Sequence, residues 1–141
     1  MSRALGVDLG SRRIGISASD PTGTLASPVG VVERRDDRTA EHREIVALAT
    51  ELGADTIVVG MPLSLDGSRG PAARAVEEEL RRLRPVARAA GFEVDTYDER
   101  FSTVTADHGL REARLGRRKR RDRIDAAAAT VILQSWLEAH R

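Results

Sequence analysis

The chain has 141 residues, 40% of them hydrophobic and 32% charged, with a formal net charge of +1, which suits one folded domain over residues 1–141. No apolar run approaches the roughly 20 residues that cross a membrane, and the first residues lack the apolar stretch of a signal peptide, so we expect a cytoplasmic protein that does not bind membranes. The absence of cysteine excludes disulfides and thiolate metal sites.

Three short strands are predicted at the start of the chain, over residues 4–9, 14–19 and 29–33. The sequence Asp20-Pro21-Thr22-Gly23 between the second and the third is a strong turn signal. Turns this short favour antiparallel neighbours, because a parallel crossover needs about a dozen residues. The chain is therefore expected to begin with three antiparallel strands.

After the third strand, the spacing of the apolar residues predicts alternating helices and strands. An amphipathic helix is expected around residues 45–52, and a β-branched strand over residues 56–59. Pro71 suits the first turn of the next helix. Pro85 should kink or break that helix and leave residues 86–90 as a separate piece.

The rest of the chain is expected to form a fifth strand and two further helices. The strand covers residues 92–97, one helix runs from 102 or 103 to about 113, and the last helix runs from about 123 to 138. Three antiparallel strands followed by alternating helices and strands predict an α/β fold with one mixed, five-stranded sheet covered by helices.

Two carboxylates lie in apolar surroundings, where an ionised group is costly unless it is paired or binds a metal. Asp8 lies inside the apolar run from Leu5 to Gly10, in the strand over residues 4–9, and Asp125 precedes the alanine run 126–129 of the last helix. Taken alone, Asp8 is equally compatible with a turn aspartate at a strand end. Asp125 alone is better explained as an acid favoured by the helix dipole.

Asp98 or Glu99, at the end of the fifth strand, offers a third carboxylate. Strand alternation puts Asp98 on the face shared by Phe92, Val94 and Thr96, and Glu99 on the opposite face. Taken alone, either residue is more simply a solvated strand end. The strand pattern leaves open which of the two belongs to a site.

Together, the three separated acids point to a metal site. Acids at strand ends and helix starts can converge at one edge of a sheet, where their mutual repulsion would be costly without a cation. Hard divalent cations take oxygen ligands, so Mg²⁺ or Mn²⁺ is the expected cofactor. Two such ions can activate a water and stabilise the leaving oxygen during phosphodiester hydrolysis.

A dense basic segment points to a nucleic-acid partner. Between residues 111 and 123 only Glu112 and Asp122 oppose the positive charges, and this segment is also the best candidate for a mobile part of the chain. The alternative is a solvated loop. The basic segment starts with Arg111 and Arg114. The residues in it that we expect to bind substrate phosphates are Arg117, Arg118, Lys119 and Arg120.

Three further arginines are candidates for phosphate contacts. Arg12 and Arg13 follow the first strand, and a solvated turn is an equally good explanation for them. Arg100 adjoins Glu99, where it would either steady a scissile phosphate or pair with Asp98.

Four segments resemble, in order, the motifs of the YqgF family, whose members are also called RuvX or Holliday junction resolvases. The resemblance spans the chain almost end to end, and four ordered motifs are specific where the first alone would be weak. The segments are Gly6-Val7-Asp8-Leu9-Gly10-Ser11-Arg12-Arg13-Ile14-Gly15, then Val59-Gly60-Met61-Pro62-Leu63 through Asp66-Gly67-Ser68, then Asp98-Glu99-Arg100-Phe101-Ser102-Thr103, and then Ile124-Asp125-Ala126-Ala127-Ala128.

The resemblance implies a ribonuclease-H-like fold and a nuclease that cuts nucleic acid. It implies that Asp8, Glu99 and Asp125 are the catalytic and metal-binding acids, and so selects Glu99 over Asp98. It links the chain to 5′-end maturation of pre-16S ribosomal RNA and, alternatively, to cleavage of four-way DNA junctions. We expect structured RNA, with branched DNA as the alternative, bound by a monomer or a homodimer.

Two other function classes are weaker. The segment Asp8-Leu9-Gly10-Ser11 also resembles the phosphate loop of actin-like and sugar-kinase ATPases, but those proteins need a second domain and this chain is too short. A non-catalytic RNA-binding factor in ribosome assembly would use the basic segment alone, and the presence of all three acids argues against it.

Overall fold

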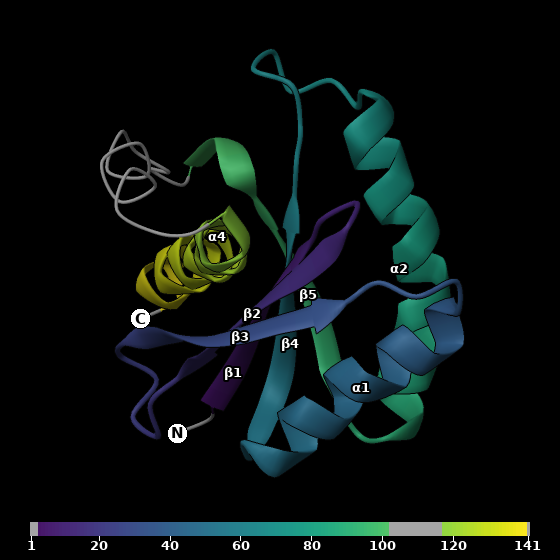
Figure 1. Cartoon of the computed structure of the whole chain (residues 1–141). Helices are drawn as coiled ribbons and strands as arrows, with labels where there is room; N and C mark the ends of the chain where they lie inside the picture. Colours follow the sequence, from purple (N-terminus) through teal and green to yellow (C-terminus); the bar gives the residue numbers. More distant parts are fainter. Residues whose placement is uncertain (1–2, 102–116, 141) are drawn as a thin grey trace.

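The computed structural model describes the main chain of residues 3–101 and 117–140, and the side chains of residues 3–100 and 126–140. Strands alternate with helices after an initial three-strand unit (Figure 1). The elements are β1 (Arg3–Leu9), β2 (Arg13–Ser19), β3 (Ala26–Glu33), α1 (Arg38–Glu51), β4 (Ala54–Met61), α2 (Pro71–Ala89), β5 (Glu93–Asp98), the short 3₁₀ helix η1 (Glu99–Phe101) and α4 (Arg117–Ala139).

The five strands form one mixed sheet in the order β3-β2-β1-β4-β5. The pairs β1–β2 and β2–β3 are antiparallel, while β1–β4 and β4–β5 are parallel. This confirms the predicted sheet of three antiparallel strands extended by two parallel ones. The carboxyl ends of β1, β4 and β5 therefore meet at one edge of the sheet.

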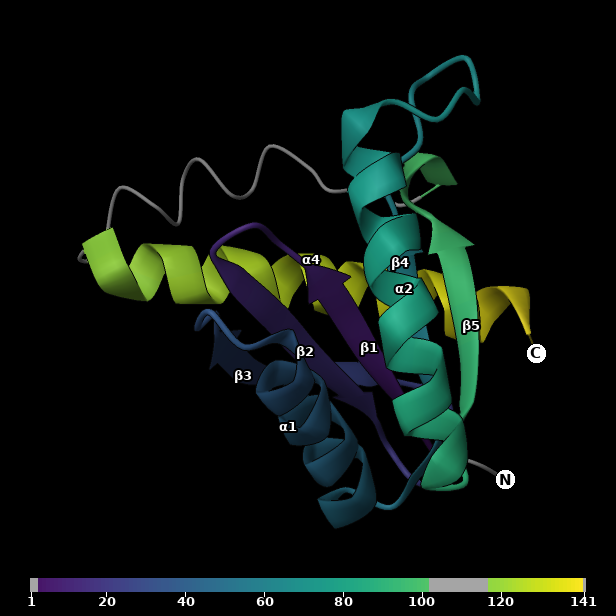
Figure 2. The ribbon, with the colours of Figure 1, turned by 90° about the vertical axis from the view of Figure 1, so that its right-hand side faces the viewer.

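Helices cover the two faces of the sheet. Helices α1 and α2 lie on one face and α4 crosses the other (Figures 1 and 2). Within β1, Leu5 and Val7 belong to the core cluster beneath α1 and α2, whereas Ala4 packs with Ile132 and Leu133 of α4. The alternation of β1 therefore directs every second side chain towards α4.

Helix α4 approaches β1 closely because residue 6 is a glycine. A Cβ atom at Gly6 would lie 2.2 Å from Ser17 Oγ, 2.8 Å from the Ala129 carbonyl oxygen and 2.8 Å from Leu133 Cβ. Ser17, which is fully buried, donates a 2.8 Å hydrogen bond to that same carbonyl. This contact fixes α4 against the centre of the sheet.

We expect Gly6→Ala to lower the free energy of unfolding by roughly 2–3 kcal/mol, because overpacking here pushes on main-chain atoms that cannot move aside. Chemical denaturation measures the change. Gly70→Ala is the matched control, since its added Cβ would meet only Ser64 Oγ, at 3.3 Å. Equal stability of the Gly6 and Gly70 variants would contradict the close approach of α4.

Two boundary predictions were wrong. Helix α2 runs through Pro85 without a break. Pro85 is exposed, so water can reach the carbonyl that it leaves unpaired, while the buried Leu83 and Ala87 hold the helix to the core on either side. Helix α4 begins at Arg117 and not near Arg123, because arginine and lysine are good helix formers.

Helix α1 begins seven residues before the helix expected around residues 45–52, because Asp37 caps its first turn by accepting a hydrogen bond from the Ala40 N–H. The other differences in element boundaries are three residues or fewer. Strand β3 begins three residues before the predicted start, and β4 extends two residues beyond the prediction at each end. The helix predicted from 102 or 103 to about 113 lies outside the described residues, as does the first half of the basic segment. Among the helices that the structure describes, none is both long and apolar enough to span a membrane.

Candidate carboxylate site

Asp8 lies near the carboxyl end of β1, the central strand of the sheet. It pairs with Gly15 of β2, and its neighbour Val7 pairs with Val59 of β4. Because Gly6 faces α4, strand alternation places Asp8 on the same face two residues further on. Asp8 is only partly buried there.

Glu99 reaches the same place from β5. It is the first residue of η1, directly after the strand ends at Asp98. A Cβ atom at Gly60 would lie 3.0 Å from Glu99 Oε2 and 2.5 Å from Ile132 Cδ1 of α4. The Glu99 carboxylate therefore lies over Gly60 of β4, on the α4 face of the sheet.

Asp98 and Glu99 lie on opposite faces of the sheet. Val94 belongs to the core beneath α1 and α2, while Tyr97 packs with the cluster beneath α4. Strand alternation correctly predicted that the two acids lie on opposite faces. Asp98 shares the face of Val94, beneath α1 and α2, whereas Asp8 lies on the face covered by α4. Glu99 and Asp8 therefore lie on one side of the sheet, and the catalytic role of Glu99 that the family resemblance implies stays a prediction.

The pKa of Glu99 is raised in this position. Burial, the charge of Asp8 and the charge of Asp98 together raise the pKa of Glu99 to about 7. Glu99 therefore binds a proton more readily than an ordinary carboxylate, because a second negative charge beside Asp8 is costly.

Asp98 is engaged elsewhere. Arg100 donates to it from Nε (2.8 Å to Oδ2) and from Nη2 (2.6 Å to Oδ2), and these hydrogen bonds lower the pKa of Asp98. Arg100 also donates from Nη1 to the Leu65 carbonyl at 3.3 Å and packs against Gly67. Of the two alternatives for Arg100, the structure shows the ion pair with Asp98, which anchors the loop after β4.

Asp125 lies in α4, four residues before Ala129, whose carbonyl accepts from Ser17. Its side chain is outside the described residues. Among the side chains that the structure does describe, no group of three histidines or acids is arranged to hold a metal ion. The structure therefore brings Asp8 and Glu99 together and leaves the role of Asp125 as a prediction.

The predicted phosphate-contacting residues fall into two groups. Arg12 is exposed in the turn between β1 and β2, whereas Arg13 pairs with Glu33 of β3 at 3.3 Å along the sheet. The other group begins α4 and consists of Arg117, Arg118, Lys119 and Arg120, whose side chains lie outside the described residues.

The two carboxylates that the structure brings together fit a divalent cation. Both offer oxygen ligands, which hard cations such as Mg²⁺ and Mn²⁺ prefer. Burial is the main cause of the raised pKa of Glu99, and the nearby charge of Asp8 raises it further. A bound cation would relieve that repulsion and favour the ionised form of Glu99.

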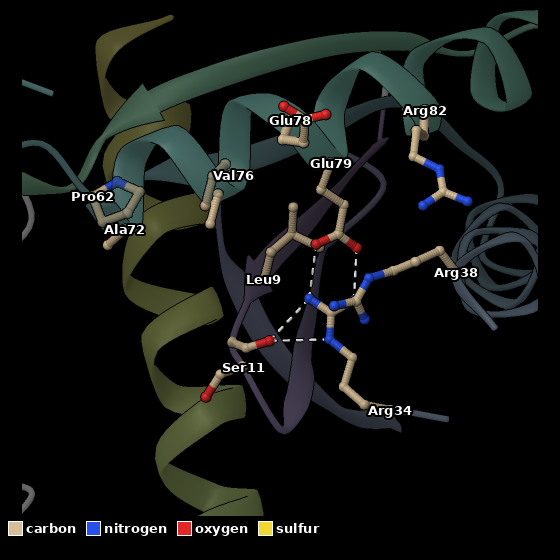
Figure 3. A pocket seen from close by; sticks show the side chains of 12 residues that line it. Leu9, Ser11, Arg34, Arg38, Pro62, Ala72, Val76, Glu78, Glu79 and Arg82 are labelled. Atoms are coloured by element: carbon tan, nitrogen blue, oxygen red, sulfur yellow. Dashed lines mark hydrogen bonds and ion pairs between the residues drawn. The ribbon is translucent and has the colours of Figure 1, made fainter. Parts of the chain in front are cut away.

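Sequence reasoning missed a second cluster of charged residues, on the opposite face of the sheet. The cluster consists of Glu41, His42 and Glu79, which are buried, and Arg34, which is half-buried. Arg34 and Glu79 line a cavity of about 450 Å³ between α2 and the turn after β1 (Figure 3). A usable signal was present, because Glu41 falls one helical turn before the buried Ile45, on the apolar face of α1.

Comparison with known proteins agrees with the fold and the motifs. The family described as "RuvX: Holliday junction resolvase" matches residues 2–139. A protein of Mycobacteroides abscessus named as a pre-16S rRNA nuclease is 45% identical over 99% of this chain and 82% of its own length. One of Anaeromyxobacter with the same name is 45% identical over 96% of both chains.

Among solved structures, the RuvC of Thermus thermophilus in complex with a Holliday junction substrate matches with a TM-score of 0.62. The match covers 99% of this chain and 96% of that one, at 17% identity. This likeness shows the fold, which is ribonuclease-H-like, and confirms the fold class predicted from the sequence.

Proposed function

The chain belongs to the RuvX Holliday junction resolvase family, and on that basis we propose that it is a metal-dependent endonuclease that processes the 5′ end of pre-16S ribosomal RNA. The observation that carries the proposal is the meeting of Asp8 and Glu99 at the carboxyl edge of the sheet, with the pKa of Glu99 raised to about 7. Two carboxylates crowded in this way suit metal-assisted hydrolysis.

Asp8, Glu99 and Asp125 are the residues that would hold Mg²⁺ or Mn²⁺. Positions 125, 129 and 133 follow one another along one face of α4, and Ala129 and Leu133 lie over Gly6. This spacing supports a place for Asp125 one helical turn from the point where α4 touches β1. When bound, divalent ions would activate the attacking water and stabilise the leaving oxygen.

The protein's own residues prepare the site for this chemistry. Glu99 must release its proton to act as a ligand, and partial burial keeps its carboxylate directed over Gly60 and away from bulk water. Arg100 forms an ion pair with Asp98, and the adjacent Glu99, at the start of η1, is the acid that faces Asp8. Asp8 is held by the backbone of β1, and Glu99 by η1 directly after β5, so that its side chain lies over β4 between them.

Nucleic acid is the substrate class that the charge distribution supports. Arg117, Arg118, Lys119 and Arg120 form the first turn of α4, the same helix that carries Asp125. Basic side chains there would bind phosphates beside the cleavage site, and Arg12 would extend this surface on the other side of Asp8. Ribosomal RNA processing would place the protein in the cytoplasm.

Cleavage of four-way DNA junctions is the second candidate function. The description of the matching family favours it, and a junction resolvase would act as a symmetric dimer that cuts two strands. RNA processing requires only one site and is compatible with a monomer.

The test offers a pre-16S rRNA 5′-end fragment and a four-way DNA junction side by side, with Mg²⁺ or Mn²⁺ and with a chelator as the control. We expect metal-dependent cleavage of the RNA, measured on sequencing gels. Preferential cleavage of the junction, by a species that is dimeric in analytical ultracentrifugation, would favour the resolvase. Binding of the RNA without cleavage of either substrate would favour a non-catalytic assembly factor.

A further inference from the structure

The buried charged cluster opposite α4 calls for a role beyond packing. The side chains of Arg34 and Glu79 are each 9% exposed, and that of Glu41 is fully buried. His42 lies 2.8 Å from Glu79 through Nε2. Buried ion pairs contribute little net stability compared with apolar side chains of the same size, so stability alone does not explain the cluster.

Arg34 is the centre of this cluster, and all three of its guanidinium nitrogens are used. Nη1 donates to Glu41 (2.8 Å) and Glu79 (2.6 Å), and Nη2 donates to the other oxygen of Glu79 (2.9 Å). Burial by itself would raise the pKa of Glu79, but hydrogen bonds from His42 and Arg34 outweigh it and lower that pKa to about 2. The Arg34–Glu79 pair is therefore charged.

The remaining donors of Arg34 hold the turn that follows Asp8. Nε and Nη2 both donate to the Gly10 carbonyl, at 3.0 and 2.9 Å, and the Arg34 backbone N–H donates to the Arg12 carbonyl at 3.2 Å. Gly10 in turn donates its own N–H to the Asp8 carbonyl at 2.9 Å. Two hydrogen bonds in series thus connect the guanidinium to the main chain of Asp8.

We propose that Arg34, oriented by Glu79 and Glu41, is a positioning residue that fixes the Gly10 turn and thereby the direction of the Asp8 carboxylate. The idea that Asp8 is catalytic rests on the proposed function. The hydrogen bonds from Arg34 to the Gly10 and Arg12 carbonyls, which we call the clamp on the turn, do not depend on it. Asp8 and Arg34 lie on opposite faces of the sheet, so the effect passes through the backbone of β1. A shift of about 1 Å in a reacting group can lower a rate by up to about a hundredfold.

The geometry distinguishes Arg34 from its neighbour Arg38. Arg38 donates to the same Glu41 oxygen, at 2.9 Å, but among the hydrogen bonds of the described residues it has none to the turn. Arg38→Gln is therefore a matched control that removes a cation from the cluster and leaves the clamp in place. Figure 3 shows both arginines on the wall of the cavity, with Arg34 reaching Glu79.

Three variants test the proposal. Arg34→Lys keeps the charge but loses the planar fork that reaches Gly10 and Glu79 together. The double variant Arg34→Leu/Glu79→Leu replaces the ion pair by apolar side chains, which such sites commonly tolerate. Arg38→Gln is the control, and circular dichroism verifies that each variant is folded at the assay temperature.

The first readout is amide hydrogen exchange of Gly10, followed by NMR, with the amide of the buried Val58 in β4 reporting global opening. We expect Gly10 to exchange at least about tenfold faster in Arg34→Lys and in the double variant, with no change in Arg38→Gln. The second readout is cleavage kinetics, where we expect kcat to fall by about ten- to a hundredfold with KM within about threefold of the wild type.

Unchanged Gly10 exchange in both Arg34 variants would overturn the clamp. Faster Gly10 exchange with wild-type kcat would overturn the effect on Asp8. If the wild-type protein cleaves neither RNA nor the DNA junction, the proposed function fails, whereas the exchange experiment still decides whether Arg34 holds the turn.

Discussion

Replacing Asp8 by asparagine is expected to lower the rate of RNA cleavage at saturating Mg²⁺ by about a thousandfold or more. The amide has the shape of the carboxylate but carries no charge, so it is a poor ligand for a hard cation and cannot help to stabilise the charge that develops in the transition state. RNA affinity, measured in Ca²⁺ or without metal, should remain within about threefold of the wild type, because phosphate contacts supply most of it.

The structure offers a matched control for this variant. Asp55 is an exposed acid near the start of β4, at the end of the sheet away from the site, and Asp55→Asn removes the same charge there. We expect this control to cleave RNA at the wild-type rate. An Asp8→Asn protein that kept more than a tenth of the wild-type rate would show that Asp8 does not act in the chemical step.

Asp8→Asn should also lower the pKa of Glu99. The Asp8 charge is the second cause of the raised pKa of Glu99, after burial. Removing it should move that pKa part of the way back towards its ordinary value while burial continues to hold it up. An unchanged titration of Glu99 in Asp8→Asn would show that the two carboxylates do not lie close enough to interact.

Most of the fold was predictable because its signals are local. Alternation along β1 and the short turns before β2 and β3 predicted three antiparallel strands, and the helical period that follows predicted the parallel extension. Pro85 misled the prediction, because a proline breaks a helix only where tertiary packing does not hold both sides, and the burial of Leu83 and Ala87 is not visible in the local sequence.

The site was partly predictable for the same reason. The strand pattern separated Asp98 from Glu99 correctly, but choosing between them required knowing that α4 covers the face of Gly6, and this is a contact between residues more than a hundred positions apart. The Arg34 clamp was missed because its partners come from two helices and a turn. The burial of an acid such as Glu79 can be predicted only when the cation that pairs with it, here Arg34, is known.

The unfolding free energy of the metal-free protein should carry a distinct dependence on pH that belongs to Glu99. Its pKa is about 7 in the folded protein and 4.5 as an ordinary carboxyl, so between these values the folded state holds a proton that the unfolded state has released. Stability from this group therefore falls as the pH rises from about 4.5 to 7, by roughly 1–2 kcal/mol in total, because solvent screening reduces the effect for a partly exposed side chain.

Glu79 and Asp98, two described acids with shifted pKa values, do not titrate in this pH range. The pKa of Glu79 is lowered to about 2 and that of Asp98 is also lowered, so their contributions are lost only as the pH falls below about 4.5. Urea denaturation of the wild type and of Glu99→Gln from pH 4.5 to 8 gives the difference, and the glutamine variant should lack the decline. Parallel curves for the two proteins would exclude a raised pKa at Glu99.

Divalent cations should reverse this decline, which links the titration to the proposed chemistry. A cation binds the ionised form of Glu99 and competes with its proton, so the stabilisation by Mg²⁺ or Mn²⁺ should increase from pH 5.5 to pH 8. Thermal unfolding with and without metal measures this increase, and Glu99→Gln should show little of it. Stabilisation that is equal at both pH values would mean that the cation binds away from Glu99, and the proposed two-carboxylate site would then be wrong even if the protein cleaves RNA.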